Sequence, residues 1–87
     1  MSNRGNQWVE FSKEVLCHID DYTVPQYGDM PDDQVEEFTL ADFKTNLKKY
    51  MNRIGSNARG NDEAVRDAFK IAHYACIMCA LLRKEVE

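Results

Sequence analysis

Apolar residues recur every three or four positions in the first quarter of the chain, and this spacing is typical of one face of an α-helix. The stripe consists of Trp8, Phe11, Val15, Ile19 and Tyr22. It predicts a first helix over residues 7–22. Val24 precedes Pro25, and a residue before proline disfavours helical backbone. We therefore expect the helix to end before Val24 and residues 1–6 to form a flexible N-terminus.

Residues 23–38 are rich in acidic residues and contain both prolines of the chain, which predicts an acidic loop. Pro31 suits the first position of a helix. A short helix over residues 32–38 is therefore expected in the second half of this loop.

A second helix is predicted over residues 40–54. Thr39 is a good N-cap, and Asp42, three residues later, resembles a capping box. One side of the helix is apolar and the other is polar and mostly basic. The apolar side holds Leu40, Phe43, Leu47, Tyr50, Met51 and Ile54, and the polar side holds Lys48, Lys49, Asn52 and Arg53. Gly55 is placed to end the helix in left-handed backbone, before a polar loop.

The third helix is expected to begin at Asn61 or Asp62 and to run to about residue 84. Its second half, residues 74–82, is apolar on every side, and such a helix is normally buried on every side. Two short helices and a loop are too little to cover it, so the sequence predicts a partner, most simply a second copy of the chain.

Small residues on the third helix support close packing with another helix. They repeat every four positions, as Ala68, Ala72, Cys76 and Ala80. The close contact is either with a second copy or, within one chain, with the first or second helix.

A chain of 87 residues is one domain, here residues 1–87. The predicted fold is all-α, with three main helices, a central C-terminal helix and a helical homodimer. Three cysteines fit a reducing compartment better than a disulfide scaffold. The chain shows neither an apolar leader nor a stretch long enough to span a bilayer, so we expect a cytoplasmic protein with no membrane partner.

Charge is unevenly distributed, although the net charge is only −4. Residues 20–42 carry eight acidic residues and no basic one, whereas residues 43–60 carry five basic residues and no acidic one. Blocks of one sign mark an interaction surface or an internal electrostatic match. Three alternatives follow: the acidic segment lies along the basic helix, the basic stripe faces an anion, or the two blocks meet between subunits.

The basic stripe predicts an anion or ligand site. Lys49 and Arg53 are one helical turn apart and can reach one anion. Arginine suits phosphate because its planar fork donates two parallel hydrogen bonds. The complete predicted site is Lys49, Tyr50, Arg53, Arg59, Lys70 and His73. The alternative for His73 is a hydrogen-bonded residue at the edge of the core.

Acidic residues early in the third helix form a weaker candidate site, for Mg²⁺. Asp62, Glu63 and Asp67 are its candidate ligands, with help from Glu36 and Glu37. The alternative is that these carboxylates are solvated and complement the positive end of the helix dipole. The favoured expectation is no metal and no cofactor.

Cys76 and Cys79 match a C-x-x-C pattern. They lie within the apolar helix, where we expect small, inert core cysteines rather than redox or zinc ligands. No arrangement typical of nucleophilic catalysis, of a phosphate loop or of a zinc protease is recognisable. The sequence therefore favours a protein that is not an enzyme.

Two segments carry a family resemblance. Residues 49–57 with Arg59, and then residues 67–75, resemble a K-Y-x-x-R-x-G signature followed by an acidic residue and K-x-A-x-Y. Together with the loop over residues 24–29, they look like small uncharacterised helical proteins of phages and prophages. More distantly, the chain is similar to all-α nucleotide pyrophosphohydrolases of the MazG type, but their E-x-x-E and E-x-x-D metal motifs are not matched.

The leading functional expectation is a small non-enzymatic binding or interaction module, phage- or prophage-related, that forms a homo-oligomer or binds a protein. The alternative is a nucleotide- or phosphate-binding protein, derived from a MazG-like hydrolase; nucleic acid is not an expected partner. An open basic cluster favours ligand binding, whereas a cluster covered by Asp29, Asp32 and Asp33 favours a structural role.

Overall fold

The computed structural model describes residues 1–29, 39–56 and 60–86. These ranges contain helices and no strand, which confirms the all-α prediction. The elements, in order along the chain, are α1 (Asn3–His18), the π-helical segment η1 (Ile19–Thr23), α2 (Val24–Tyr27), α4 (Leu40–Ser56) and α5 (Asn61–Val86). The predicted short helix over residues 32–38 lies outside the described residues.

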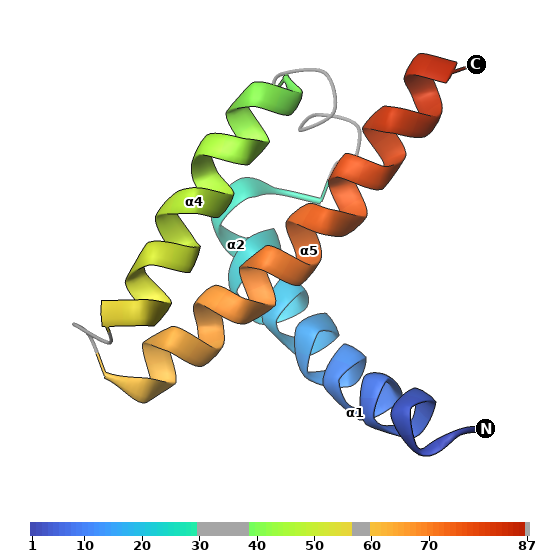
Figure 1. Ribbon diagram of the computed structural model, residues 1–87, viewed down its shortest axis with the longest axis vertical. Helices are drawn as coiled ribbons and strands as arrows, with labels where there is room; N and C mark the ends of the chain where they lie inside the picture. The colour runs from blue at the N-terminus through green and yellow to red at the C-terminus, as the bar shows by residue number, and fades with distance from the viewer. Residues whose placement is uncertain (30–38, 57–59, 87) are drawn as a thin grey trace.

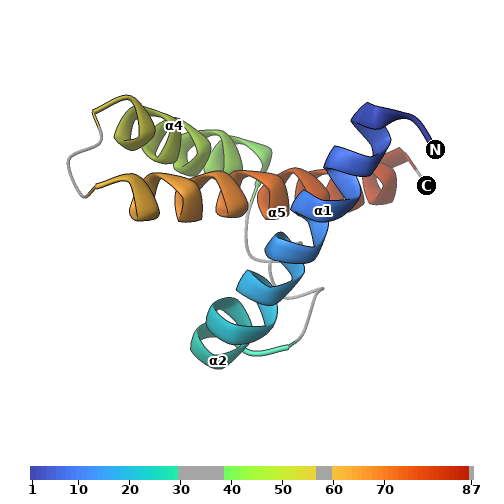
Figure 2. The same ribbon diagram turned by 90° about the horizontal axis from the view of Figure 1, so that it is seen from below.

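The C-terminal helix α5 is central, as predicted. Helix α4 packs antiparallel to α5, and α1 crosses α5 on its other side (Figures 1 and 2). The segments η1 and α2 continue α1. Residues 3–27 therefore form one long helical arm, which packs against the hairpin made by α4 and α5. This arrangement forms a corner between the arm and the hairpin, and the candidate site lies in that corner.

The N-terminal helix is longer than its apolar stripe suggests. Its first turn is capped by Ser2, whose hydroxyl accepts a hydrogen bond from Gly5 N–H at 3.0 Å. Residues 3–6, expected to be flexible, therefore belong to α1.

The prediction that this helix ends before Val24 is wrong. The Val24 N–H donates to the Ile19 carbonyl, five residues back, and helical backbone continues to Tyr27. Pro25 lies in the first turn of α2, where a missing N–H costs little. The helix stops at Gly28, which has a φ of 88°.

The start of α4 confirms the capping box. Asp42 N–H donates to the Thr39 hydroxyl at 3.3 Å, and Thr39 N–H donates to the Asp42 carboxylate at 2.9 Å. The predicted end at Gly55 is wrong, because α4 continues to Ser56 and Gly55 is not in left-handed backbone. Gly60 takes that conformation instead, with a φ of 92°, immediately before α5 begins at Asn61.

The core is small and lies between α4 and α5. Phe43 is fully buried and packs with Ile77 and Leu81, with part-buried apolar side chains around them. On the other side of α5, Val15 and His18 of α1 are buried, and His18 contacts the ring of Phe69 at 5.8 Å between centroids.

As expected for a chain with few elements to cover it, the second half of α5 is not buried on every side within the single chain. Ile77 and Leu81 are buried, but Leu82 is 45% exposed. Ala75, Cys76, Cys79 and Ala80 are also exposed. The cysteines are therefore not core residues, and Cys17 is exposed as well. Helix α5 buries the face toward α4 and leaves another face open because the chain has too few elements to cover it. Among the described helices, none is long and apolar enough to cross a membrane.

Candidate functional site

A partly open pocket of about 240 Å³ lies in the corner between the N-terminal arm and the hairpin. Residues from three parts of the chain line it, and we call each of these three groups a wall of the pocket. The arm contributes His18, Tyr22, Thr23, Gln26 and Tyr27. Helix α5 contributes Glu63, Arg66, Lys70, His73 and Tyr74, and α4 contributes Tyr50. We refer to these residues as the corner pocket.

The arm wall depends on the π-helical segment. His18 ends α1 and stacks on Tyr22 of η1, with 5.3 Å between ring centroids. His18 is only 7% exposed, so its ring is fixed by the packing around it. π-Helical turns are frequently found at functional sites, and here η1 begins directly after His18 and contains Tyr22.

The α5 wall is made of side chains that helical periodicity places on one face of the helix. Glu63, Arg66, Lys70 and His73 are separated by three or four residues, so their side chains share one face of the helix. Arg66 forms an ion pair with Glu63, and its guanidinium lies over the ring of Tyr22 at 5.6 Å. This contact connects the α5 wall with the arm wall.

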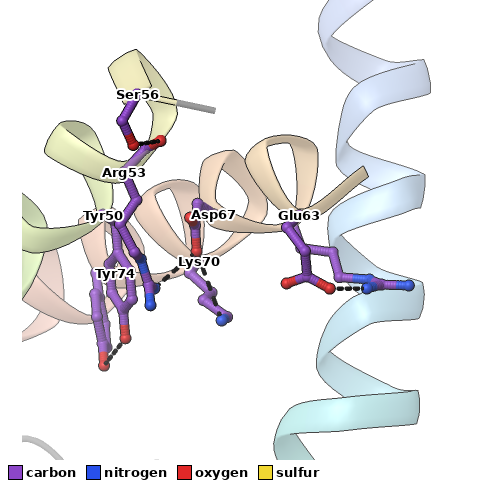
Figure 3. A network of polar contacts seen from close by, with 8 residues as sticks. Tyr50, Arg53, Ser56, Glu63, Asp67, Lys70 and Tyr74 are labelled. Atoms are coloured by element: carbon purple, nitrogen blue, oxygen red, sulfur yellow. Dashed lines mark hydrogen bonds and ion pairs between the residues drawn. The ribbon is translucent and has the colours of Figure 1, made fainter. Parts of the chain in front are cut away.

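The α4 wall consists of Tyr50, which is paired with Tyr74 of α5. Their rings stack at 5.7 Å between centroids, and their hydroxyl oxygens are 3.5 Å apart (Figure 3). The ammonium group of Lys70 lies 5.4 Å from the centre of the Tyr50 ring. The pocket therefore presents tyrosine rings next to two cations, Arg66 and Lys70.

Only some residues of the predicted basic site line the corner pocket. Tyr50, Lys70 and His73 line the corner pocket. Lys49 is exposed on α4 and is not part of the pocket lining. Arg59 lies outside the described residues.

Arg53 is occupied by a structural ion pair. Its guanidinium lies 2.9 Å from the carboxylate of Asp67, which is only 5% exposed, and stacks over the Tyr50 ring at 4.9 Å. Lys70 is 3.7 Å from the same carboxylate (Figure 3). The basic stripe is thus partly neutralised by an acid from α5, an arrangement that none of the three charge alternatives included. Of the three residues predicted to cover the basic cluster, Asp29 is exposed, and Asp32 and Asp33 lie outside the described residues.

Both histidines of the pocket favour their neutral forms. Burial lowers the pKa of His18, and the positive charges of Lys70 and Arg66 lower it further. Burial also lowers the pKa of His73, with a further contribution from His18. At neutral pH, Arg66 and Lys70 are therefore the positive groups of the lining, and the imidazoles are uncharged hydrogen-bonding groups.

Tyr74 keeps its proton at any physiological pH. Burial and the contact with the Tyr50 hydroxyl raise its pKa above the ordinary range for tyrosine. The Tyr74 hydroxyl is therefore neutral and is able to donate a hydrogen bond to an anion or to accept one.

The arm wall was missed by sequence reasoning. None of its residues was among the predicted site residues, and of the α5 wall Arg66 and Tyr74 were missed as well. The available signal was that His18 and Tyr22 are one helical turn apart and aromatic. Their position opposite Lys70 depends on how α1 crosses α5, which no local pattern specifies.

The candidate Mg²⁺ ligands already have other partners. Glu63 pairs with Arg66, and Asp67 pairs with Arg53 and Lys70. Asp62 is exposed. In the part of the chain that the structure describes, no three histidine, cysteine or acidic side chains gather as a metal site. Glu36 and Glu37 lie outside that part.

Comparison with protein-family models, with curated proteins and with solved structures found no match to this chain. The resemblance to phage proteins and to MazG-type enzymes therefore stays a prediction.

Proposed function

We propose that this chain is a small non-enzymatic binding module, and that the corner pocket binds a small anion that carries a flat ring. One observation carries the proposal: four tyrosines and two cations line the same pocket. Tyrosine rings offer stacking surface, and Arg66 and Lys70 offer charge-assisted hydrogen bonds.

The volume of the pocket favours a small ligand. At about 240 Å³, it is slightly below the roughly 300–1,000 Å³ of pockets that hold drug-sized molecules. A single ring with one anionic group suits this space better than a long chain. A nucleotide fits the same chemistry if part of it lies outside the pocket.

The contacts of the two cations favour recognition. Arg66 is held by Glu63 and Tyr22, and Lys70 is held by Asp67 and Tyr50. Side chains fixed by neighbours in this way lose little conformational entropy when a ligand binds. These contacts support a pre-organised binding site.

Calorimetric titration with phenyl phosphate, adenosine 5′-monophosphate and benzoate tests the proposal. At least one of these ring-bearing anions is expected to bind, and Lys70→Gln is expected to lower its affinity by about tenfold, the loss of one charge-assisted hydrogen bond. Lys49→Gln is the matched control, because Lys49 is exposed on α4 outside the pocket lining. No binding to the parent protein, or an equal loss in both variants, would contradict the proposal.

We further propose that the module forms a homodimer through the open face of α5. The supporting observation is that Leu82 is 45% exposed beside a row of small side chains, Ala75, Cys76, Cys79 and Ala80, which are also exposed. Small side chains let two helix backbones approach closely, and a second copy brings an identical face. The solution mass tests this assembly, as described in the Discussion.

A further inference from the structure

The two histidines of the corner pocket are neighbours of its two cations. His18 from the arm and His73 from α5 line the same cavity as Arg66 and Lys70. Tyr22 and Tyr27 of the arm and Tyr50 of α4 also face this cavity. Of the described residues, Glu63 and Tyr74 of α5 are the remaining titratable groups of the lining.

The fixed charge of this lining is small. Among the described residues that line the pocket, Arg66 and Lys70 are the cations at neutral pH; Glu63 offsets the first, and Asp67, beside Lys70, is paired with Arg53. A monoanion is matched by the single positive charge that remains. A dianion requires more positive charge, and imidazole is the group that supplies it near neutral pH.

We infer that the corner pocket takes a phosphate monoester dianion on a flat ring, and that His18 and His73 take up protons when it binds. The inference rests on the proposed function and specifies its ligand class. The protons come from solvent and add to the nitrogen atoms that are unprotonated in the free protein. No covalent bond to the ligand forms or breaks.

The physical reason for proton uptake is the change in local charge. In the free protein, burial and the neighbouring cations disfavour imidazolium at His18. A phosphate dianion next to Arg66 and Lys70 offsets their charge and favours imidazolium instead. Binding and protonation then strengthen each other, because linkage between two equilibria is reciprocal.

Phenyl phosphate and phenyl sulfate provide matched probes of similar shape. Phenyl phosphate is mostly a dianion at pH 7.4, since a phosphate monoester has a second pKa of about 6, whereas phenyl sulfate is a monoanion. We expect phenyl phosphate to bind at least about tenfold more tightly, the effect of one pKa unit of coupling. Calorimetry at pH 7.4, in two buffers of different ionisation enthalpy, counts the protons taken up with each probe.

The protein is expected to take up about half a proton or more when phenyl phosphate binds, and much less when phenyl sulfate binds. His73→Gln is expected to reduce the uptake with phenyl phosphate. Equal affinity for the two probes, no proton uptake, or an unchanged uptake in His73→Gln overturns the inference and leaves the proposed function standing. If neither probe nor any other ring-bearing anion binds, the proposed function itself is rejected.

Discussion

At the scale of single residues, Asp67 organises the charges between α4 and α5. Its buried carboxylate forms an ion pair with Arg53 of α4 and lies near Lys70 of α5. Arg53 is therefore held against the Tyr50 ring, and Lys70 is positioned at the edge of the corner pocket. A residue that the sequence suggested as a metal ligand is thus an internal counter-ion.

Replacing Asp67 by Asn is expected to lower the free energy of unfolding by about 2–3 kcal/mol, because Arg53 then keeps its charge in a part-buried place without an ionic partner. Urea denaturation measures this loss. Glu10→Gln is the control, since Glu10 pairs with Lys13 where both are exposed, and it is expected to cost less than about 1 kcal/mol. Similar losses in the two variants would contradict the role given to Asp67.

The lowered pKa values of His18 and His73 determine how the stability of the free protein should depend on pH. Their pKa values are lower in the folded protein than in the unfolded chain, so the unfolded chain binds more protons below about pH 6.5. The melting temperature of the free protein is therefore expected to fall as the pH decreases from 7.5 to 5.5. His73→Gln removes one of these groups and is expected to flatten the decrease. A melting temperature that rises over this range would contradict the assigned directions.

At the scale of elements, local signals predicted the hairpin well and the N-terminal arm poorly. The capping box of Thr39 and Asp42 is confirmed because its hydrogen bonds lie within four consecutive residues. The end before Val24 was wrong because a π-helical turn carried helical backbone past it to Tyr27. The start of α1 was also misplaced, because Ser2 caps the helix at Asn3.

Thr39→Ala is expected to cost about 1 kcal/mol of stability, since it removes the side chain that accepts from Asp42 N–H. Thr45→Ala serves as the comparison. Thr45 is exposed within α4 and its hydroxyl donates to the Ala41 carbonyl of the same helix, so alanine there is expected to be neutral or slightly stabilising. Chemical denaturation separates the two, and an equal effect would show that the cap contributes nothing specific.

At the scale of the whole molecule, the fold class and the central position of α5 were predictable, but most of the site was not. Periodicity identified α4 and α5 and, with them, Tyr50, Lys70 and His73. The arm wall depends on where α1 crosses α5, a tertiary contact without a local pattern. His18 and Arg66 became site residues only through that crossing.

The open face of α5 predicts a dimer in solution. Light scattering after size exclusion is expected to give a mass of about twice the 10.1 kDa of one chain at micromolar concentration. Leu82→Glu places a charge in that face and is expected to shift the mass toward one chain. Met51→Glu is the control, since Met51 is an exposed apolar residue of α4 rather than of α5. A parent protein with the mass of one chain would contradict the assembly.

The most direct test of the central claim, that the corner pocket is a binding site for a ring-bearing anion, is to locate the bound ligand. Nuclear magnetic resonance of the ¹⁵N-labelled protein titrated with phenyl phosphate maps the residues that it affects. The largest amide shifts are expected around His18, Lys70 and His73, which line the pocket from two helices. Shifts restricted to the exposed basic side of α4 around Lys48 and Lys49, or no shifts at all, would contradict the claim.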